Sequence, residues 1–306
     1  MSGTDDWRRG RPLLVLGGSG QVGGCVLAEA RRRYGQGAAV GTCLAHPAPG
    51  LVQADLQNPE ELALLVAHIE PAAVIIAAAF AWVDGCEMDA ERTRRTNVDG
   101  PRAVATACEK LGAVPVLLGT DYVFDGEAGP YSEDDPVRPI SAYGRSKLDA
   151  ERAVAGRCPA ALLVRTNVVY SWLPAGNNFL MQVVTKLGKG EPMRVPADQS
   201  NNPTYAPDLA AALCELLEAR AAGVWHFGGG DFLGRHDFGV AIAQAFDLDA
   251  SLLQPVTTQE LKQPAARPLK SGLRTARFEA LAGRKPLTSR EGIARALALS
   301  RGDAGA

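Results

Sequence analysis

The sequence has neither a surplus of positive charge nor a long hydrophobic run. Its 306 residues include 32 Lys and Arg against 34 Asp and Glu, which gives a net charge of -2 at pH 7. Binding to a phosphate backbone needs many basic residues, so nucleic acid is not an expected partner. The start, MSGTDDWRRGR, has no apolar run behind it beyond a short strand, so neither a signal peptide nor a membrane anchor is expected. We therefore expect a cytoplasmic protein with a small-molecule ligand.

Paired cysteines are also missing. The six cysteines lie singly, without a Cys-x-x-Cys motif or a metal-like spacing to the four histidines. This pattern is typical of buried thiols in a reducing cytosol, and it predicts no metal site. The cysteines are Cys25, Cys43, Cys86, Cys108, Cys158 and Cys214.

What the sequence does contain is an alternation of short apolar runs and helix-like stretches from Leu13 to about Arg165. Continuous apolar strands separated by helices predict a parallel sheet covered on both faces. The expected fold class is therefore α/β, with a Rossmann-type doubly wound parallel sheet. After Arg165 the alternation weakens and Pro and Gly become frequent, as in loops around a cleft. We expect a smaller, interleaved C-terminal substrate-binding domain there.

The helical periodicity of PDLAAALCELLEAR predicts that the chain re-enters the first domain before it finishes in the second. The predicted domains are a dinucleotide-binding Rossmann domain at 11–168, re-entered at about 196–222, and a substrate-binding domain at 169–195 and 223–300. The ends, residues 1–10 and 301–306, are expected to be disordered.

One helix start can be predicted residue by residue. Asn58 can cap a helix, Pro59 suits the first helical position, and Glu61 stands where the acid of a capping box belongs. We therefore expect a helix that begins at this point.

A glycine loop follows the first apolar run. The string LLVLGGSGQVGG places Gly17, Gly20 and Gly23 between a predicted strand and a predicted helix. Such glycines permit a tight turn, a close approach of backbone to pyrophosphate, and close helix packing, with the helix N-terminus aimed at the anion. In this context the loop predicts dinucleotide binding, although a purely structural glycine turn is the alternative.

The end of the second predicted strand bears on the choice of cofactor. NAD-preferring Rossmann proteins usually carry an acid there, whereas VGTCLAHPAPG contains neither an acid nor an arginine. This favours NADPH, with NADH as the alternative. His46 is the nearest candidate for a 2′-phosphate partner, or else an ordinary loop histidine. Asp55 is placed to hydrogen-bond the adenine, or else to cap the loop that follows it.

Three further residues suggest a catalytic site. Tyr143 and Lys147 lie four residues apart on one predicted helix face, where an ammonium can lower the pKa of a phenol. Taken alone, this spacing is also typical of an exposed helical pair. Thr120, however, ends the fifth apolar run, and doubly wound proteins bind ligands at the carboxyl ends of their strands. A cofactor loop, a hydroxyl and a tyrosine acid in this order predict hydride transfer.

Beyond these motifs, the chain from about Pro12 to about Leu299 resembles an extended short-chain dehydrogenase/reductase, and within that class the dTDP-4-dehydrorhamnose reductase group. The strings that carry the resemblance are GGSGQVGG, VDGCE from Val83, NVDGP from Asn97, GTDYVFDG, YGRSKLDAE, RTNVVYS from Arg165, NNF at 177–179, DQSNNPTYAPDLA from Asp198, and ARPLKSGL from Ala266. Together they are far more specific than any single motif.

The resemblance implies site residues as well as a fold. It implies that Thr120, Tyr143 and Lys147 form a catalytic triad. The expected cofactor contacts are Gly17, Gly20, Gln21, Val22, Gly23, Thr42, His46, Asp55, Leu56, Ala77, Ala78, Ala79, Asn97, Tyr143 and Lys147. The expected substrate contacts are Val83, Asp121, Tyr122, Asn178, Phe179, Gln199 and Arg267, the last as a phosphate ligand or else as a structural arginine.

Two departures concern the sugar site. Val168 stands where these reductases usually carry a tryptophan, and Lys270 where they carry an asparagine. Both changes fall near the expected sugar site. The expected function is NAD(P)H-dependent reduction of a nucleotide-linked ketosugar, with Tyr143 as the proton donor.

Alternative functions and the oligomeric state stay open at this point. The chain is also similar to the regulatory subunit of methionine adenosyltransferase, which makes a non-catalytic NADP-binding protein the alternative. An epimerase or dehydratase is disfavoured because no acid–base pair follows Thr120; Asp121 is followed by Tyr122. The expected partner is the nucleotide-sugar substrate, and a homodimer stays open.

Overall fold

The structure is a computed structural model that describes residues 7–44, 48–174 and 176–302. Its contacts divide the chain into two compact units. Unit 1 comprises residues 1–120, 141–165 and 210–225, and unit 2 comprises residues 121–140, 166–209 and 226–306. The predicted division differs from these bounds mainly at 121–140 and 196–209. Residues 1–6 and 303–306, which belong to the segments predicted to be disordered, lie outside the described residues.

A seven-stranded sheet in the order β11-β6-β5-β4-β1-β2-β3 forms the centre of unit 1, as far as the chain is described. The strands are β1 (Leu13–Leu16), β2 (Ala39–Cys43), β3 (Leu51–Gln53), β4 (Ala73–Ile76), β5 (Val114–Thr120), β6 (Leu162–Thr166) and β11 (Gly223–His226). All pairs from β3 across to β5 are parallel. The reversal of strand order on either side of β1 is that of a doubly wound fold, so the predicted fold class is confirmed.

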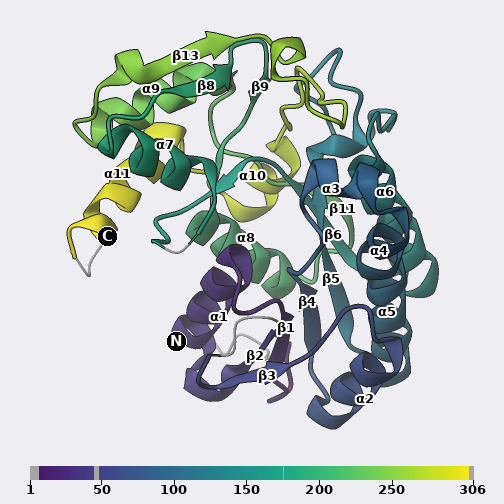
Figure 1. Cartoon of the computed structure of the whole chain (residues 1–306). Helices are drawn as coiled ribbons and strands as arrows, with labels where there is room; N and C mark the ends of the chain where they lie inside the picture. The colour runs from purple at the N-terminus through teal and green to yellow at the C-terminus, as the bar shows by residue number, and fades with distance from the viewer. Residues whose placement is uncertain (1–6, 45–47, 175, 303–306) are drawn as a thin grey trace. The chain divides into compact units, whose positions relative to one another are not determined.

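Helices cover both faces of this sheet (Figure 1). They are α1 (Gln21–Tyr34), α2 (Pro59–Ile69), α3 (Val83–Met88), α4 (Ala90–Arg94), the π-helix η2 (Arg95–Asp99), α5 (Gly100–Leu111), α6 (Ala142–Arg157) and α8 (Ala206–Glu218), which begins in unit 2. Figure 1 shows α2, α4, α5 and α6 along one face and α1 and α8 along the other. Buried strands such as LLVL, covered on both sides, explain why these segments are continuously apolar.

The predicted start of α2 is confirmed. Asn58 accepts a hydrogen bond from the backbone N–H of Glu61 at 3.3 Å, and Pro59 is the first helical residue. The Asn58 amide also donates to the Glu61 carboxylate at 3.0 Å. Local capping chemistry thus determines where this helix begins.

Unit 2 is built from short elements around a separate core. Its helices are α7 (Phe179–Gly188), α9 (Arg235–Ala245), α10 (Ala276–Ala282) and α11 (Ser289–Ser300). Its strand pairs are β7 (Val169–Tyr170) with β10 (Thr204–Tyr205), β8 (Met193–Pro196) with β13 (Leu253–Val256), and β9 (Ser200–Asn201) with β12 (Leu233–Gly234). Its core includes the buried rings of Tyr170, Phe179 and Phe238, and the ring of Phe238 contacts the other two.

Three expectations about composition can be compared with the described residues. All six cysteines are free; five are buried, and Cys25 is partly exposed. No described helix is long and apolar enough to cross a membrane. Within the described ranges no group of three or more His, Cys, Asp or Glu side chains is placed to hold a metal ion.

Candidate functional site

Glycine is needed at the three loop positions for different structural reasons. Gly17 has φ +86°, a conformation that side-chain-bearing residues rarely adopt. A Cβ at Gly23 would lie 2.1 Å from the carbonyl oxygen of Gly17, so α1 can approach the loop only with glycine there. A Cβ at Gly20 would meet only that same oxygen, at 3.2 Å. Gly17 and Gly23 therefore serve the loop itself, whereas the exposed Gly20 is open to a ligand.

An unsatisfied amide lies at the head of α1. Gln21 is the first residue of this helix, next to Val22, and its Nε2 atom is buried without a hydrogen-bond partner. Buried polar groups in folded proteins nearly always have a partner, so an orphan of this kind points to a missing ligand. A dinucleotide phosphate at a helix N-terminus would supply acceptor oxygens at this place.

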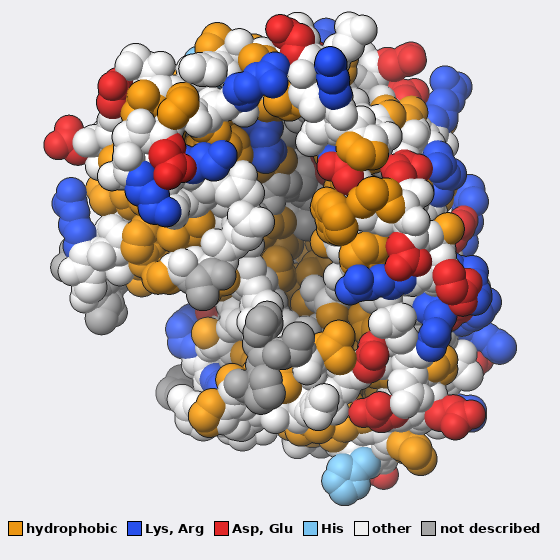
Figure 2. Space-filling view, viewed as in Figure 1, with side chains coloured by type: hydrophobic (Ala, Val, Ile, Leu, Met, Phe, Trp, Pro, Cys, Tyr) orange, Lys and Arg blue, Asp and Glu red, His pale blue; other side chains and the backbone are white. Residues whose placement is uncertain are grey.

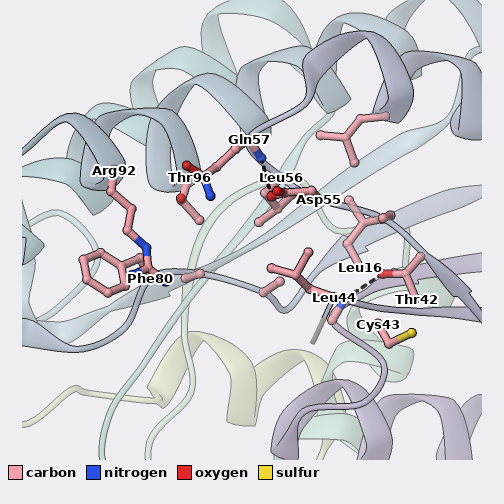
Figure 3. Close-up of a pocket in the computed structure, with 15 residues that line it drawn as sticks. Leu16, Thr42, Cys43, Leu44, Asp55, Leu56, Gln57, Phe80, Arg92 and Thr96 are labelled. Atoms are coloured by element: carbon pink, nitrogen blue, oxygen red, sulfur yellow. Dashed lines mark hydrogen bonds between the residues drawn. The ribbon is translucent and has the colours of Figure 1, made fainter. Parts of the chain in front are cut away.

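A pocket continues from the glycine loop along the ends of β1, β2 and β4 (Figure 3). Its lining includes the predicted residues Gly17, Thr42, Asp55, Leu56, Ala78 and Ala79. It also includes residues that the sequence analysis did not single out, among them Leu44, Gln57, Phe80, Arg92 and Thr96. The predicted Ala77 directly follows β4, and its N–H donates to the carbonyl of Leu16 at 3.0 Å. His46 lies outside the described residues.

Polar atoms in this pocket are partly engaged and partly open. Thr42 Oγ1 accepts a hydrogen bond from the N–H of Gly17 at 3.0 Å, which ties β2 to the glycine loop. Asp55 Oδ1 accepts from the N–H of Gln57 at 2.9 Å, the loop-capping alternative, and the adenine contact stays a prediction. Thr96 Oγ1 is buried without a partner, and the Arg92 guanidinium lies 4.2 Å from the ring centroid of Phe80. The polar groups that line the pocket therefore fit a nucleotide. Thr96 Oγ1 is, after Gln21 Nε2, the second buried polar atom here that a bound ligand could hydrogen-bond.

Asn97 connects this pocket to the helix that carries Tyr143. Its Oδ1 accepts from the N–H of Phe80 at 2.8 Å, and its Nδ2 donates to the carbonyl of Phe80 and to Ser146 Oγ, both at 3.1 Å. Ser146 Oγ in turn donates to the carbonyl of Tyr143 at 2.8 Å. Both amide protons of Asn97 are used within the protein, so its geometry is that of a positioning residue. The π-helix η2 that carries it is a rare local form that is frequent at functional sites.

The segment from Phe80 to α3 leads from the pocket to α6. Val83 begins α3, and the Trp82 ring packs on Gly85, where a Cβ would lie 2.4 Å from it. Hydrophobic side chains gather over α3 on the face drawn in Figure 2; Trp82 and Met88 are each 60% exposed. The Glu87 carboxylate accepts from the N–H of Ala142 at 2.6 Å, which holds α3 against the start of α6.

Tyr143 and Lys147 lie one turn apart on α6, which Ser141 caps through the N–H of Gly144 at 3.1 Å. Lys147 is only 4% exposed, so an exposed helical pair is not what this position holds. Burial lowers the pKa of Lys147 to about 8, against the opposing influence of Glu151 and Cys86. A buried ammonium with a pKa near 8 is well suited to lower the pKa of a neighbouring phenol.

A buried ion pair explains how β5 approaches α6. Glu151 accepts from Arg165 at 3.0 Å from Nε and 2.8 Å from Nη2, and both side chains are buried. A Cβ at Gly119 would lie 2.7 Å from this carboxylate, so glycine is needed where β5 passes it. Thr120 follows as the last residue of β5, 5% exposed, at the strand end where the sequence analysis placed it.

Unit 2 holds the predicted substrate residues other than Val83. Asn178 caps α7 through the N–H of Met181 at 3.2 Å and donates to the carbonyl of Ser171, so its amide is engaged. Gln199 donates to Thr258 Oγ1 at 3.0 Å. Arg267 is partly buried and donates to the carbonyl of Ala265 at 3.3 Å.

The remaining predicted residues cluster near Arg235, which the sequence analysis missed. Asp121, Tyr122 and Arg267 lie close enough to influence its pKa electrostatically. Phe179 lies beneath its guanidinium, with the ring centroid 4.2 Å away. Its position in GRHDF resembles any polar helix start, so the sequence carried no signal for it.

The fold and the glycine loop, with Tyr143 and Lys147 on one helix, define a protein of the short-chain dehydrogenase/reductase class. The chain belongs to the dTDP-4-dehydrorhamnose reductase family, because the family model described as the RmlD substrate binding domain matches residues 11–301. It is 34% identical over 298 residues to the dTDP-4-dehydrorhamnose reductase of Mycobacterium tuberculosis, covering 95% of this chain and 93% of that protein.

Solved structures agree with this family. A dTDP-4-dehydrorhamnose reductase from Clostridium acetobutylicum superposes with a TM-score of 0.85 at 30% identity, covering 95% of this chain and 99% of the other. The enzyme from Bacillus anthracis, solved in complex with NADP, gives a TM-score of 0.84 at 27% identity, with coverage of 94% and 98%. The predicted resemblance is thereby confirmed.

Proposed function

We propose that this chain reduces the keto group of a nucleotide-linked 4-ketosugar with a nicotinamide dinucleotide, NADPH or NADH. The observation that carries the proposal is the buried Lys147, one helical turn from Tyr143, in the same unit as a glycine loop with an orphaned Gln21 amide. The family membership supports reductase chemistry, and the names of the relatives support a sugar joined to a nucleoside diphosphate.

Each residue then has a role in the reaction. Gly20 and Gln21 bind the dinucleotide phosphates at the start of α1, on the turn that Gly17 and Gly23 make possible. The bound dinucleotide supplies a hydride to the keto carbon. Thr120 hydrogen-bonds the oxygen on which negative charge develops, and Tyr143 Oη transfers its proton to that oxygen.

Lys147 has two tasks in this scheme. Its ammonium lowers the pKa of the Tyr143 phenol, and it hydrogen-bonds the ribose next to the nicotinamide. Asn97 keeps the carbonyl of Tyr143 and the loop at Phe80 in register through Ser146. The catalytic tyrosine is therefore oriented before substrate arrives.

A screen of nucleotide-linked 4-ketosugars with NADPH and NADH, followed by loss of reduced-nicotinamide absorbance, tests the proposal. We expect turnover of at least one such sugar, at a rate proportional to the concentration of the protein. A chain that binds NADPH with ordinary affinity but reduces none of them would instead match a non-catalytic, cofactor-binding regulatory subunit.

A further inference from the structure

A pocket of about 300 Å³ lies at the amino ends of the strands of unit 1. Its wall is formed where the chain enters three parallel strands: Arg11 precedes β1, Ala72 directly precedes β4, and Val114 begins β5. The glycine loop and Thr120 stand at the carboxyl ends of the same strands. At about 3.3 Å per residue, the two ends of the seven-residue β5 are about 20 Å apart. The pocket is therefore separate from the site that we propose for the reaction.

Arginine dominates the lining of this pocket. Neither an aspartate nor a glutamate is among the described residues that line it. Glu218, two residues before Arg220, is engaged elsewhere, since it accepts from Arg33 at 3.0 Å and from Tyr34 at 2.7 Å. Several positive charges without a carboxylate in the wall create a positive potential that attracts an anion. The lining arginines are Arg8, Arg9, Arg11 and Arg220.

Arg11 is held in place by the two helices that end beside it. Its Nε donates to the carbonyl of Glu70, directly after α2, at 2.9 Å. Its Nη2 donates to the carbonyls of Pro71 at 2.6 Å and of Leu111, the last residue of α5, at 3.3 Å. Carbonyl groups accept these hydrogen bonds without neutralising the guanidinium. Arg11 therefore adds a positive charge of fixed position to the wall of the pocket.

Arg9 and Arg220 have a left-handed backbone, with φ +49° and +55°. This conformation is uncommon for residues other than glycine, and arginine is not among the residue types enriched in it. Arg220 follows the end of α8, at a position where glycine is the usual residue. Glycine would thus suit the backbone better at both positions, yet both carry arginines that line one pocket. A residue kept against the preference of the backbone indicates a use for its side chain.

Trp7 adds a hydrogen-bond donor to the pocket. Its indole Nε1 is buried and has no hydrogen-bond partner within the described part of the chain. A buried indole N–H usually has an acceptor, so this atom points to an acceptor that a ligand would bring. Leu217 lines the same pocket and, with the indole ring, provides an apolar part of the wall.

These features favour a small anion with several negative charges. Guanidinium groups match the oxygens of phosphate in a planar, two-point manner, and an indole N–H can donate to a further oxygen. We propose that this arginine pocket binds the di- or triphosphate group of a small metabolite, either an inorganic polyphosphate or a nucleotide. The site goes beyond the proposed function, because its ligand is neither the cofactor nor the substrate of the reaction and its occupancy does not require turnover.

Titration calorimetry on the full chain saturated with NADPH, with pyrophosphate as the probe, tests the proposal. In the double variant Arg9→Gly/Arg220→Gly, two exposed cations are lost where glycine fits the backbone. The Kd for pyrophosphate should rise about 10- to 100-fold, the effect of losing charge-assisted hydrogen bonds. The urea midpoint should be no lower than that of the wild type. Lys262→Gly, which removes an exposed cation at φ +49° from unit 2, is the matched control and should leave the Kd unchanged.

Two further readouts separate binding in this pocket from binding elsewhere. Pyrophosphate should raise the melting temperature of the wild type more than that of the double variant, because a ligand stabilises the folded state that binds it. The tryptophan fluorescence should change when pyrophosphate is added, and this change should be lost in Trp7→Phe, which keeps an aromatic ring but lacks the indole N–H. The Kd for NADPH should be equal in all these proteins, since the glycine loop lies at the other end of β1.

ATP, titrated in the same way, distinguishes the two sources of the phosphate group. Where the pocket serves a nucleotide, the ATP binding that the double variant loses should be at least about tenfold tighter than that of pyrophosphate. Where it serves an inorganic polyphosphate, the two affinities should be similar, and either result supports the site.

A wild type that binds neither probe would overturn the proposal, as would a folded double variant that binds pyrophosphate as tightly as the wild type. Weaker pyrophosphate binding accompanied by a lower urea midpoint and weaker NADPH binding would show a structural effect and would also overturn it. If the double variant does not fold, Arg220→Gly alone provides the same comparison.

Discussion

The two units hold their ligand-facing residues by different means. In unit 1 these residues stand at the ends of buried strands and at the start of α1, where backbone ladders fix them. In unit 2 the strands near Arg235 are only two residues long. Side-chain hydrogen bonds, rather than backbone pairing, hold the residues in place there. Asp198 alone accepts from the N–H and the hydroxyl of Thr258, at 2.9 and 2.7 Å. Regular backbone thus positions the residues that we propose for the chemistry, whereas individual side-chain hydrogen bonds position those that we propose for substrate recognition.

If the units divide labour in this way, Tyr143→Phe should remove turnover without removing either ligand. The variant lacks only the phenolic oxygen, so kcat should fall by about 100- to 10,000-fold, the usual contribution of a positioned acid. NADPH and dTDP should bind with unchanged Kd by calorimetry. A loss in kcat below about tenfold would mean that another group is the acid.

Gly20→Val should affect cofactor binding in unit 1 alone. The backbone at Gly20 is extended, and a Cβ there meets only the carbonyl oxygen of Gly17, at 3.2 Å, so the loop has to shift by a few tenths of an ångström to take valine. The branched side chain then stands where phosphate must approach. We expect the Kd for NADPH to rise at least about tenfold, an effect of one lost set of phosphate contacts. The Kd for dTDP should not change.

Gly37→Val is the control for this substitution, because a Cβ at the exposed Gly37 meets nothing within 4 Å. A Gly20→Val protein with native circular dichroism and unchanged NADPH affinity would show that the loop is only structural.

The pH dependence of unit 1 follows from Lys147. Its pKa of about 8 means that the ammonium is lost as pH rises through that value, and with it the influence on Tyr143. The value of kcat/KM should therefore decline above pH 8, and the decline should follow the loss of a single proton. Lys147→Arg should move this limb beyond the accessible pH range, because a guanidinium stays charged. An identical limb in Lys147→Arg would assign the titration to another group.

The stability of the fold should change with pH in the opposite direction to kcat/KM. Between pH 8 and 10.5 the unfolded lysine binds a proton that the folded one has released, so the free energy of unfolding rises with pH, by up to about 3 kcal/mol. Lys147→Met should remove this rise in denaturation experiments. A rise that persists in this variant would contradict the origin assigned to it.

The smallest expected effect concerns Val168 in unit 2. This β-branched residue has φ +40°, a left-handed conformation that costs a side-chain-bearing residue about 1 to 2 kcal/mol. Val168→Gly should therefore be more stable than Val168→Ala by about 1 kcal/mol, the reverse of the order usual elsewhere in a chain. Equal midpoints in urea for the two variants would show that the backbone is not strained there.

Much of unit 1 could be predicted from the sequence because its features are contiguous. The apolar runs, the glycine loop and the cap at Asn58 each lie within a few residues of chain. The lining by Arg92 and Thr96 could not be predicted, since it depends on which face of a short helix meets the pocket.

In unit 2 the decisive pairings are remote in sequence. Residues 121–140 were predicted to belong with the first domain, yet Gly126 accepts from the N–H of Lys270 at 2.8 Å and Tyr131 accepts from Arg274 at 2.7 Å. Such contacts over more than 140 residues leave no periodic pattern. Arg235 was missed for the same reason, because its importance comes from Phe179 and Arg267 rather than from its neighbours in the chain.

The most direct test of the account is a single-turnover experiment with NADPH carrying deuterium at the transferred position, mixed with the wild type and a ketosugar from the screen. Cofactor oxidation should slow with the deuterated compound, and the deuterium should be recovered on the former keto carbon of the sugar. With Tyr143→Phe the same transfer should be slowed by at least about 100-fold. Oxidation without deuterium in the sugar, or equal rates for wild type and Tyr143→Phe, would contradict it.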